Sequence, residues 1–140
     1  IKVLPERFVD KFVMHYYDKD DVTYHRYDLT KHIKTKNTAP FVRIIIEEED
    51  DLMIAERFDF ITKQPNYNIA TNTGDRFETI QVASQSFLIY EDHYYEIPLK
   101  RKQMKRLFVD KYDELRIRIK EDEIDLKDPV NLLAIISTIE

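Results

Sequence analysis

The sequence predicts an α+β fold in which an antiparallel, strongly curved sheet or open barrel of five to seven strands precedes two or three short C-terminal helices. The hydrophobic period changes from two to about 3.6 within Ser86–Phe108. Before Ile97, the predicted strands are rich in β-branched and aromatic residues. No helix long enough to cross between parallel strands interrupts them, which favours antiparallel pairing in chain order.

Length and composition limit the possible functions. A chain of 140 residues fits one domain, with strands expected in 1–98 and helices in 99–140. Its one glycine, Gly74, excludes G-x-G-x-x-G and Walker-type phosphate loops, because both need several glycines close together. The absence of cysteine excludes disulfides and thiolate chemistry. A net charge of −5 argues against general nucleic-acid binding, and no apolar run approaches the roughly 20 residues of a membrane helix.

The N-terminal part predicts a hairpin followed by a loop and a strand. Lys11–Tyr17 and Val22–Tyr27 have strand composition, and the polar turn Asp18–Asp21 joins them. The polar segment Leu29–Pro40 predicts a loop and is the stretch most prone to disorder. Phe41–Ile46 predicts a strand that is buried on both faces near its end.

The middle of the chain predicts a second hairpin. An acidic turn over Glu47–Asp51 separates the preceding strand from a returning strand over Leu52–Ile61. A helix over Asp51–Arg57 is an alternative, because its residues are good helix formers. Thr62–Asp75 predicts a loop, in which Tyr67–Ile69 could add a short edge strand and Gly74 supplies a turn.

Two or three more strands follow, over Phe77–Ser84 and Phe87–Ile97, and Pro98 ends them. A helix over Lys100–Phe108 comes next.

Asp110 is expected to cap a second helix, although Leu115–Ile119 also alternates as a strand would. Asp128 followed by Pro129 is a helix start signal. An apolar stripe then consists of Leu132, Leu133, Ile136 and Ile139.

Tyrosine and cationic residues are the best candidates for a binding site. Nine tyrosines cluster mainly on two predicted hairpins, and tyrosine gives a large contact area at a small entropy cost. A basic run over Lys100–Arg106 could bind an anion, but a solvated helix face is the favoured interpretation, because the total charge is negative. The predicted binding residues are Tyr16, Tyr24, Tyr90, Tyr94, Tyr95, Lys102 and Arg106.

Catalytic and metal motifs are absent from the sequence. The acidic turn Glu47–Asp51 lacks the spacing of an EF-hand loop, and no serine lies in a G-x-S-x-G motif. His15 and His25 could face each other in the first hairpin, but no third ligand is apparent. We therefore predict no catalytic residue, no metal site and no cofactor.

The C-terminal part resembles small exported proteins of the Bacteroidota, mostly of uncharacterised function, in which a tyrosine-rich β region is followed by short helices. The residues that carry the resemblance are Phe87-Leu88-Ile89-Tyr90, His93-Tyr94-Tyr95-Glu96-Ile97, Lys102–Phe108, Asp110-Lys111 and Asp128–Ile139. The tyrosine-asparagine pair common at the end of such proteins is not found here. The resemblance implies an extracytoplasmic location and a non-enzymatic role.

The leading hypothesis is a non-catalytic binding or assembly module that contacts another protein through a tyrosine-rich sheet face. One alternative is a metal-assisted hydrolase that uses clustered Asp and Glu. The other is anion or nucleic-acid binding by the Lys100–Arg106 helix.

Overall fold

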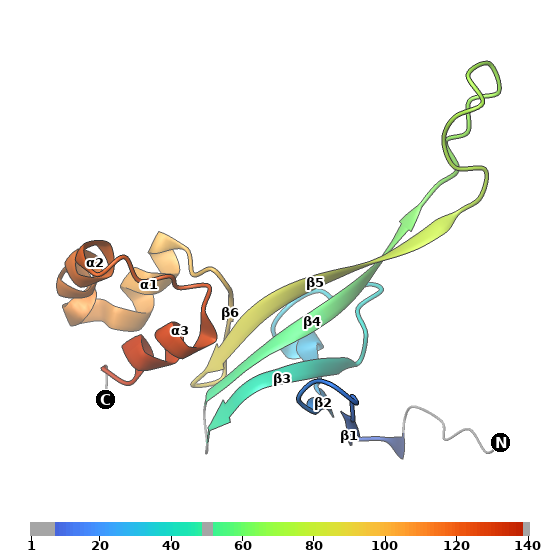
Figure 1. Ribbon diagram of the computed structural model, residues 1–140. Coiled ribbons are helices and arrows are strands. Elements are labelled where there is room, and N and C mark those ends of the chain that lie inside the picture. The colour runs from blue at the N-terminus through green and yellow to red at the C-terminus, as the bar shows by residue number, and fades with distance from the viewer. Residues whose placement is uncertain (1–7, 49–51, 139–140) are drawn as a thin grey trace. The chain divides into compact units, whose positions relative to one another are not determined.

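The structure is a computed structural model that describes residues 8–48 and 52–138. It confirms the predicted α+β class, with a curved antiparallel sheet of six strands followed by short helices (Figure 1). The strands pair in chain order from β1 to β6, and the sheet is not closed into a barrel.

The strands are β1 (Lys11–Met14), β2 (Val22–Arg26), β3 (Phe41–Glu48), β4 (Leu52–Lys63), β5 (Thr79–Tyr90) and β6 (His93–Glu96). The helices are α1 (Arg101–Phe108), α2 (Tyr112–Glu121) and α3 (Pro129–Ile136), with 3₁₀ turns η2 (Leu29–Lys31) and η3 (Val109–Lys111).

The first hairpin forms as predicted, but its first strand is shorter. Strand β1 ends at Met14 rather than at residue 17. The register places Phe12 opposite Tyr24 and Lys11 opposite His25, so the expected pairing of His15 with His25 is wrong. His15 instead lies 2.9 Å from the Asp21 carboxylate through Nδ1.

The predicted loop over Leu29–Pro40 contains one short element, η2, which buries Leu29. Two expectations for the strands that follow are wrong. The alternative helix over Asp51–Arg57 does not form, since β4 runs from Leu52 as a strand whose first four residues are buried. Ile45 is exposed, so the end of β3 is not buried on both faces. The predicted acidic turn lies partly outside the described residues, with Glu48 ending β3.

Strand β5 is longer and more continuous than predicted. It crosses Gln85 and Ser86 without a break, so the expected strands over Phe77–Ser84 and from Phe87 are largely one. The short edge strand around Tyr67–Ile69 reduces to an isolated bridge between Asn68 and Thr73.

The hairpin between β5 and β6 depends on a two-residue turn that the sequence analysis treated as extended chain. Glu91 and Asp92 have φ values of 47° and 61°. Positive φ at both central residues is typical of type I′ turns, whose twist matches that of the flanking strands. The Ile97–Pro98 peptide bond that follows β6 is cis.

The helices start by three different devices. At α1, Gln103 Oε1 accepts a hydrogen bond of 2.9 Å from the Lys100 backbone N–H. The expected Asp110 cap is wrong, because η3 precedes α2 and the N-cap residue is Lys111. The Asp128 cap is confirmed, since its carboxylate accepts a 2.9 Å hydrogen bond from the Val130 backbone N–H. The strand alternative for Leu115–Ile119 is wrong.

The chain divides into two compact units. Unit 1 contains the described residues up to Arg43 together with Glu56–Gln85. Unit 2 contains Ile44–Ala55 and the described residues from Ser86 onward. Whether the chain behaves as one domain stays a prediction.

Most of the buried apolar side chains lie in unit 2. One cluster joins β4, β5, β6 and α3 and consists of Leu52, Ile54, Leu88, Tyr95, Ile97, Leu99, Leu132 and Ile136. A second cluster joins α1, α2 and α3 and consists of Phe108, Tyr112, Leu115 and Ile135. Within the described part of unit 1, only Leu29 and Val42 are fully buried apolar residues.

Candidate binding surface

A cluster of four aromatic rings lies on one side of the sheet of unit 1, and we call it the aromatic face. It consists of Phe12, Tyr24, Phe41 and Phe58. The Phe12 and Tyr24 rings stack with centroids 4.8 Å apart, as expected for directly opposed residues of β1 and β2. Phe41 meets Phe12 edge-to-face at 5.1 Å, and Phe58 lies 6.4 Å from Tyr24. All four side chains remain partly exposed.

Charged side chains border the aromatic face. The Arg26 guanidinium lies 5.2 Å from the centre of the Phe41 ring and donates a 3.0 Å hydrogen bond to the Val9 carbonyl. Arg43, which is opposite Tyr24 in the register, forms an ion pair with Glu56. The Arg43 side chain is 41% exposed, so a partner could still reach this guanidinium.

Two exposed residues extend the aromatic face, one at the last position of β1 and one just after it. Met14 is 42% exposed and Tyr16 is 40% exposed, and the Tyr16 hydroxyl lies 3.7 Å from the Met14 sulfur. Burial, and next the neighbouring Tyr16, raise the pKa of Tyr24 above its ordinary value. The Tyr24 phenol is therefore neutral at physiological pH and can offer a partner both a ring and a hydroxyl.

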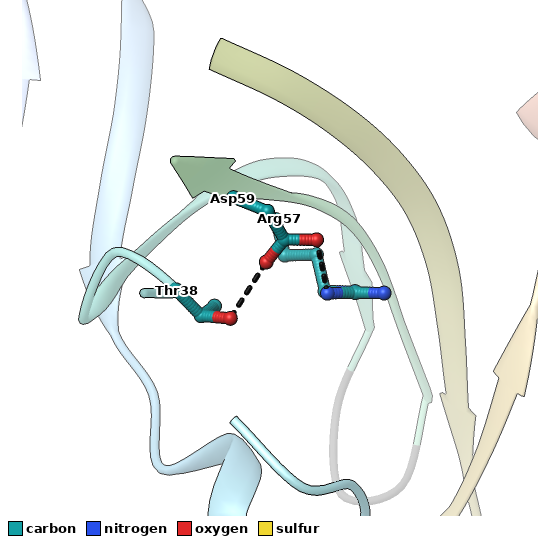
Figure 2. A network of polar contacts seen from close by, with 3 residues as sticks. All are labelled: Thr38, Arg57 and Asp59. Atoms are coloured by element: carbon teal, nitrogen blue, oxygen red, sulfur yellow. Dashed lines mark hydrogen bonds and ion pairs between the residues drawn. The ribbon is translucent and has the colours of Figure 1, made fainter. Parts of the chain in front are cut away.

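A polar network joins Thr38 to two residues of β4, Arg57 and Asp59 (Figure 2). The Asp59 carboxylate accepts hydrogen bonds of 2.6 Å from Thr38 Oγ1 and 2.5 Å from an Arg57 terminal nitrogen. Backbone hydrogen bonds of 2.8 Å, from Ala39 N–H to the Phe58 carbonyl and from Phe60 N–H to the Asn37 carbonyl, join this segment to β4. Side chains alternate along a strand, so Arg57 and Asp59 lie on the face of β4 opposite to the Phe58 ring. Their contacts hold the backbone on both sides of Phe58.

The structure divides the seven predicted binding residues between the two units. Tyr16 and Tyr24 lie in unit 1, where Tyr16 is close enough to raise the pKa of Tyr24. The other five residues belong to unit 2.

Within unit 2, the tyrosines pack largely into the fold. Tyr95 is 7% exposed in the core, and its pKa is raised by burial. Tyr94 stacks on Phe87 with centroids 5.2 Å apart, and Tyr90 packs against the core cluster.

The basic run lies on the exposed side of α1. Lys102 and Arg106 are both exposed, whereas Lys105 Nζ lies 5.5 Å above the Tyr112 ring. One of the cations is therefore placed against an aromatic ring of α2.

Sequence analysis missed Phe12, Phe41 and Phe58 as candidate binding residues. The sequence did carry a signal: an aromatic residue and a charged residue two positions apart, such as Phe41 and Arg43, lie on the same face of a strand. That pattern was interpreted only as strand formation.

A shallow depression of about 290 Å³ lies in unit 1 beside the loop after β2. Its one carboxylate belongs to Asp28, which accepts hydrogen bonds from the backbone N–H and the hydroxyl of Thr30. These bonds hold the pKa of Asp28 below its usual value. The carboxylate therefore caps η2 and is a weak proton acceptor.

No group of three or more His, Asp or Glu side chains suited to a metal ion occurs within residues 8–48 and 52–138. In that part of the chain, no helix combines the length and the apolar character needed to cross a bilayer.

Comparison with protein-family models, with curated proteins and with solved structures found no match.

Proposed function

We propose that this protein is a non-catalytic binding or assembly module, and that it recognises a partner protein through the aromatic face of unit 1. The observation that carries the proposal is a preformed cluster of rings that stays partly exposed and is extended by Met14 and Tyr16. Aromatic anchors contribute much of the energy at protein interfaces, and methionine adapts to irregular surfaces.

The sparse core of unit 1 supports the same proposal. Leu29 and Val42 are its only fully buried apolar residues in the described part of the chain. A partner protein that covered the aromatic face would remove more apolar surface from water and would complete the packing of this unit.

The binding surface proposed here is smaller than the tyrosine-rich sheet face that the sequence suggested, because it is confined to the aromatic face of unit 1. Tyr16 and Tyr24 remain binding residues, and Arg43 provides a polar contact at the border. Tyr95 is assigned a packing role because it is buried in the core of unit 2. The clustered-carboxylate alternative gains no geometric support from the described residues.

The test uses Tyr17 as a matched control, because it is a fully exposed tyrosine next to Tyr16. A photoreactive phenylalanine analogue at position 16 should give one protein adduct in the native host. With the purified partner, Tyr16→Ala and Met14→Ala should each weaken binding about tenfold, and Tyr17→Ala should not. The proposal fails if no adduct forms from position 16, or if Tyr17→Ala weakens binding as much as Tyr16→Ala.

We also propose an extracytoplasmic, bacterial setting for this binding role, supported by the resemblance of the C-terminal part alone. Fractionation of native cells with an antibody against the chain tests the location. Recovery of the protein only in the cytoplasmic fraction would contradict it.

A further inference from the structure

The distal parts of β4 and β5 form a two-stranded ribbon in unit 1, and we call it the ribbon arm (residues 60–63 and 79–84). Apart from the half-buried Ala83, its side chains are exposed on both strands. In Figure 1 these two strands run side by side toward the loop that contains Gly74. Large apolar residues are among the exposed ones, with Phe60 at 44%, Ile61 at 48%, Ile80 at 68% and Val82 at 60%.

One backbone edge of the ribbon arm has no neighbouring strand in the described chain. Strand β5 is bonded to β4 along one edge and to β6 along the other. The pairing with β6 covers only Phe87–Tyr90. Along Thr79–Ser84 the outer edge of β5 therefore presents backbone N–H and C=O groups without a described partner strand.

The sequence of this edge carries none of the usual protections against pairing. Natural sheets protect edge strands with lysine, proline, inward charges or bulges. Residues 79–86 read Thr-Ile-Gln-Val-Ala-Ser-Gln-Ser and contain no charge and no proline. Ile80 and Val82 are β-branched and favour the extended conformation.

We propose that two copies of this chain pair through Thr79–Ser84, antiparallel about a two-fold axis, so that the sheet continues from one copy into the other. Because the edge carries no charge, it has nothing to attract a charged peptide. A second copy of the same edge is neutral as well, and it pairs without placing like charges opposite each other. With Gln81 opposite Gln81 of the second copy, Ile80 lies opposite Val82 on one face and Thr79 opposite Ala83 on the other. Glu78 then faces Ser84, so no like charges are opposed. A two-fold pairing of this kind also closes, which limits assembly to a dimer.

This surface lies outside the aromatic face, so the two proposals hold or fail separately. Sedimentation velocity of the full chain over a range of concentrations should show a monomer–dimer equilibrium. Gln81→Lys should weaken dimerisation at least about tenfold, because it places two lysines opposite each other at the two-fold axis. Thr62→Lys, on β4 of the same arm and off the paired edge, should leave the equilibrium unchanged.

Pairing a negatively charged variant with the positively charged one tests the register. It also shows that each variant is folded, because an unfolded variant could not restore the dimer. Gln81→Glu alone should weaken dimerisation as much as Gln81→Lys does, and an equimolar mixture of the two variants should dimerise at least as well as the original chain. The proposal is overturned if the original chain stays monomeric at its highest soluble concentration. It is also overturned if Gln81→Lys dimerises normally, or if the mixture does not recover.

Discussion

Replacing Gly74 with alanine should open the tip of the loop between β4 and β5 without unfolding the rest of the protein. Gly74 has φ of +91°, a region that costs an L-residue about 1–2 kcal/mol. A Cβ at this position would lie 2.7 Å from the backbone oxygen of Asn66. Real Cβ atoms do not approach a backbone oxygen so closely, so the two segments must separate.

The separation would break two hydrogen bonds. The Asp75 backbone N–H donates to Asn66 Oδ1 at 2.7 Å, and the Asn66 N–H donates to the Asp75 carbonyl at 3.0 Å. Each such bond contributes about 1 kcal/mol net. With the backbone strain, the local cost is about 3–4 kcal/mol. Because the side chains at the tip are exposed, little of this cost should reach the core.

Amide hydrogen exchange measured by NMR separates the local effect from the global one. The Asn66 and Asp75 amides should exchange several hundredfold faster in Gly74→Ala, by about the factor that 3–4 kcal/mol implies, and the melting temperature should change little. Ala70→Ser, at the same exposed tip, serves as the control and should leave both amides protected. Unchanged exchange in Gly74→Ala, or equal acceleration in the control, would refute the reasoning.

Three further predictions concern unit 2. Glu123 has φ of 50° just after α2, where the Ile124 N–H donates a 3.0 Å hydrogen bond to the Ile119 carbonyl. Glycine adopts this left-handed conformation without strain, so Glu123→Gly should raise the unfolding free energy by about 1 kcal/mol, measured by denaturant titration. A decrease would contradict this. Leu132→Ala should lower it by about 2–5 kcal/mol, since Leu132 is 0% exposed in the core, and a loss below 1 kcal/mol would show that the site is not tightly packed. Burial raises the pKa of Tyr95, so its stabilising contribution is complete below the unfolded pKa near 10 and is lost as the pH rises through the folded pKa. Tyr95→Phe should therefore reduce the loss of stability above pH 10, and an identical pH profile in the variant would exclude this origin.

Local chemistry made some elements predictable. Asp128 followed by Pro129 specifies the start of α3 through a side-chain hydrogen bond and a preset φ, and both signals are visible in the sequence. The alternation of apolar residues likewise predicted the first hairpin. Such signals depend on neighbours a few residues away.

Tertiary context decided the elements that were predicted wrongly or left open. Leu52–Arg57 has helix-forming residues, but burial of its first four side chains in a sheet outweighs propensity differences of a few tenths of a kcal/mol. Asp110 has the right residue type for a cap, yet η3 moves the start of α2 past it.

The candidate site was harder to predict than the fold. Phe41 and Phe58 come from distant parts of the chain, and only the strand register brings their rings to the same side as Tyr24. The tyrosines that appeared most suited to binding included Tyr95, whose ring fills the core of unit 2. Residue type alone did not distinguish a contact surface from packing.

The interleaving of the two units along the chain has a consequence for synthesis on the ribosome. Ile44–Ala55 emerges before Glu56–Gln85, yet it belongs to unit 2, whose remaining residues follow Ser86. The apolar side chains of Leu52 and Ile54 therefore stay in contact with water until their core partners, Leu88 and finally Leu132, have been translated. The nascent chain therefore exposes this apolar stretch for a long interval. No single cut in the gene separates the two units cleanly, because a cut after Gln85 leaves Ile44–Ala55 attached to unit 1.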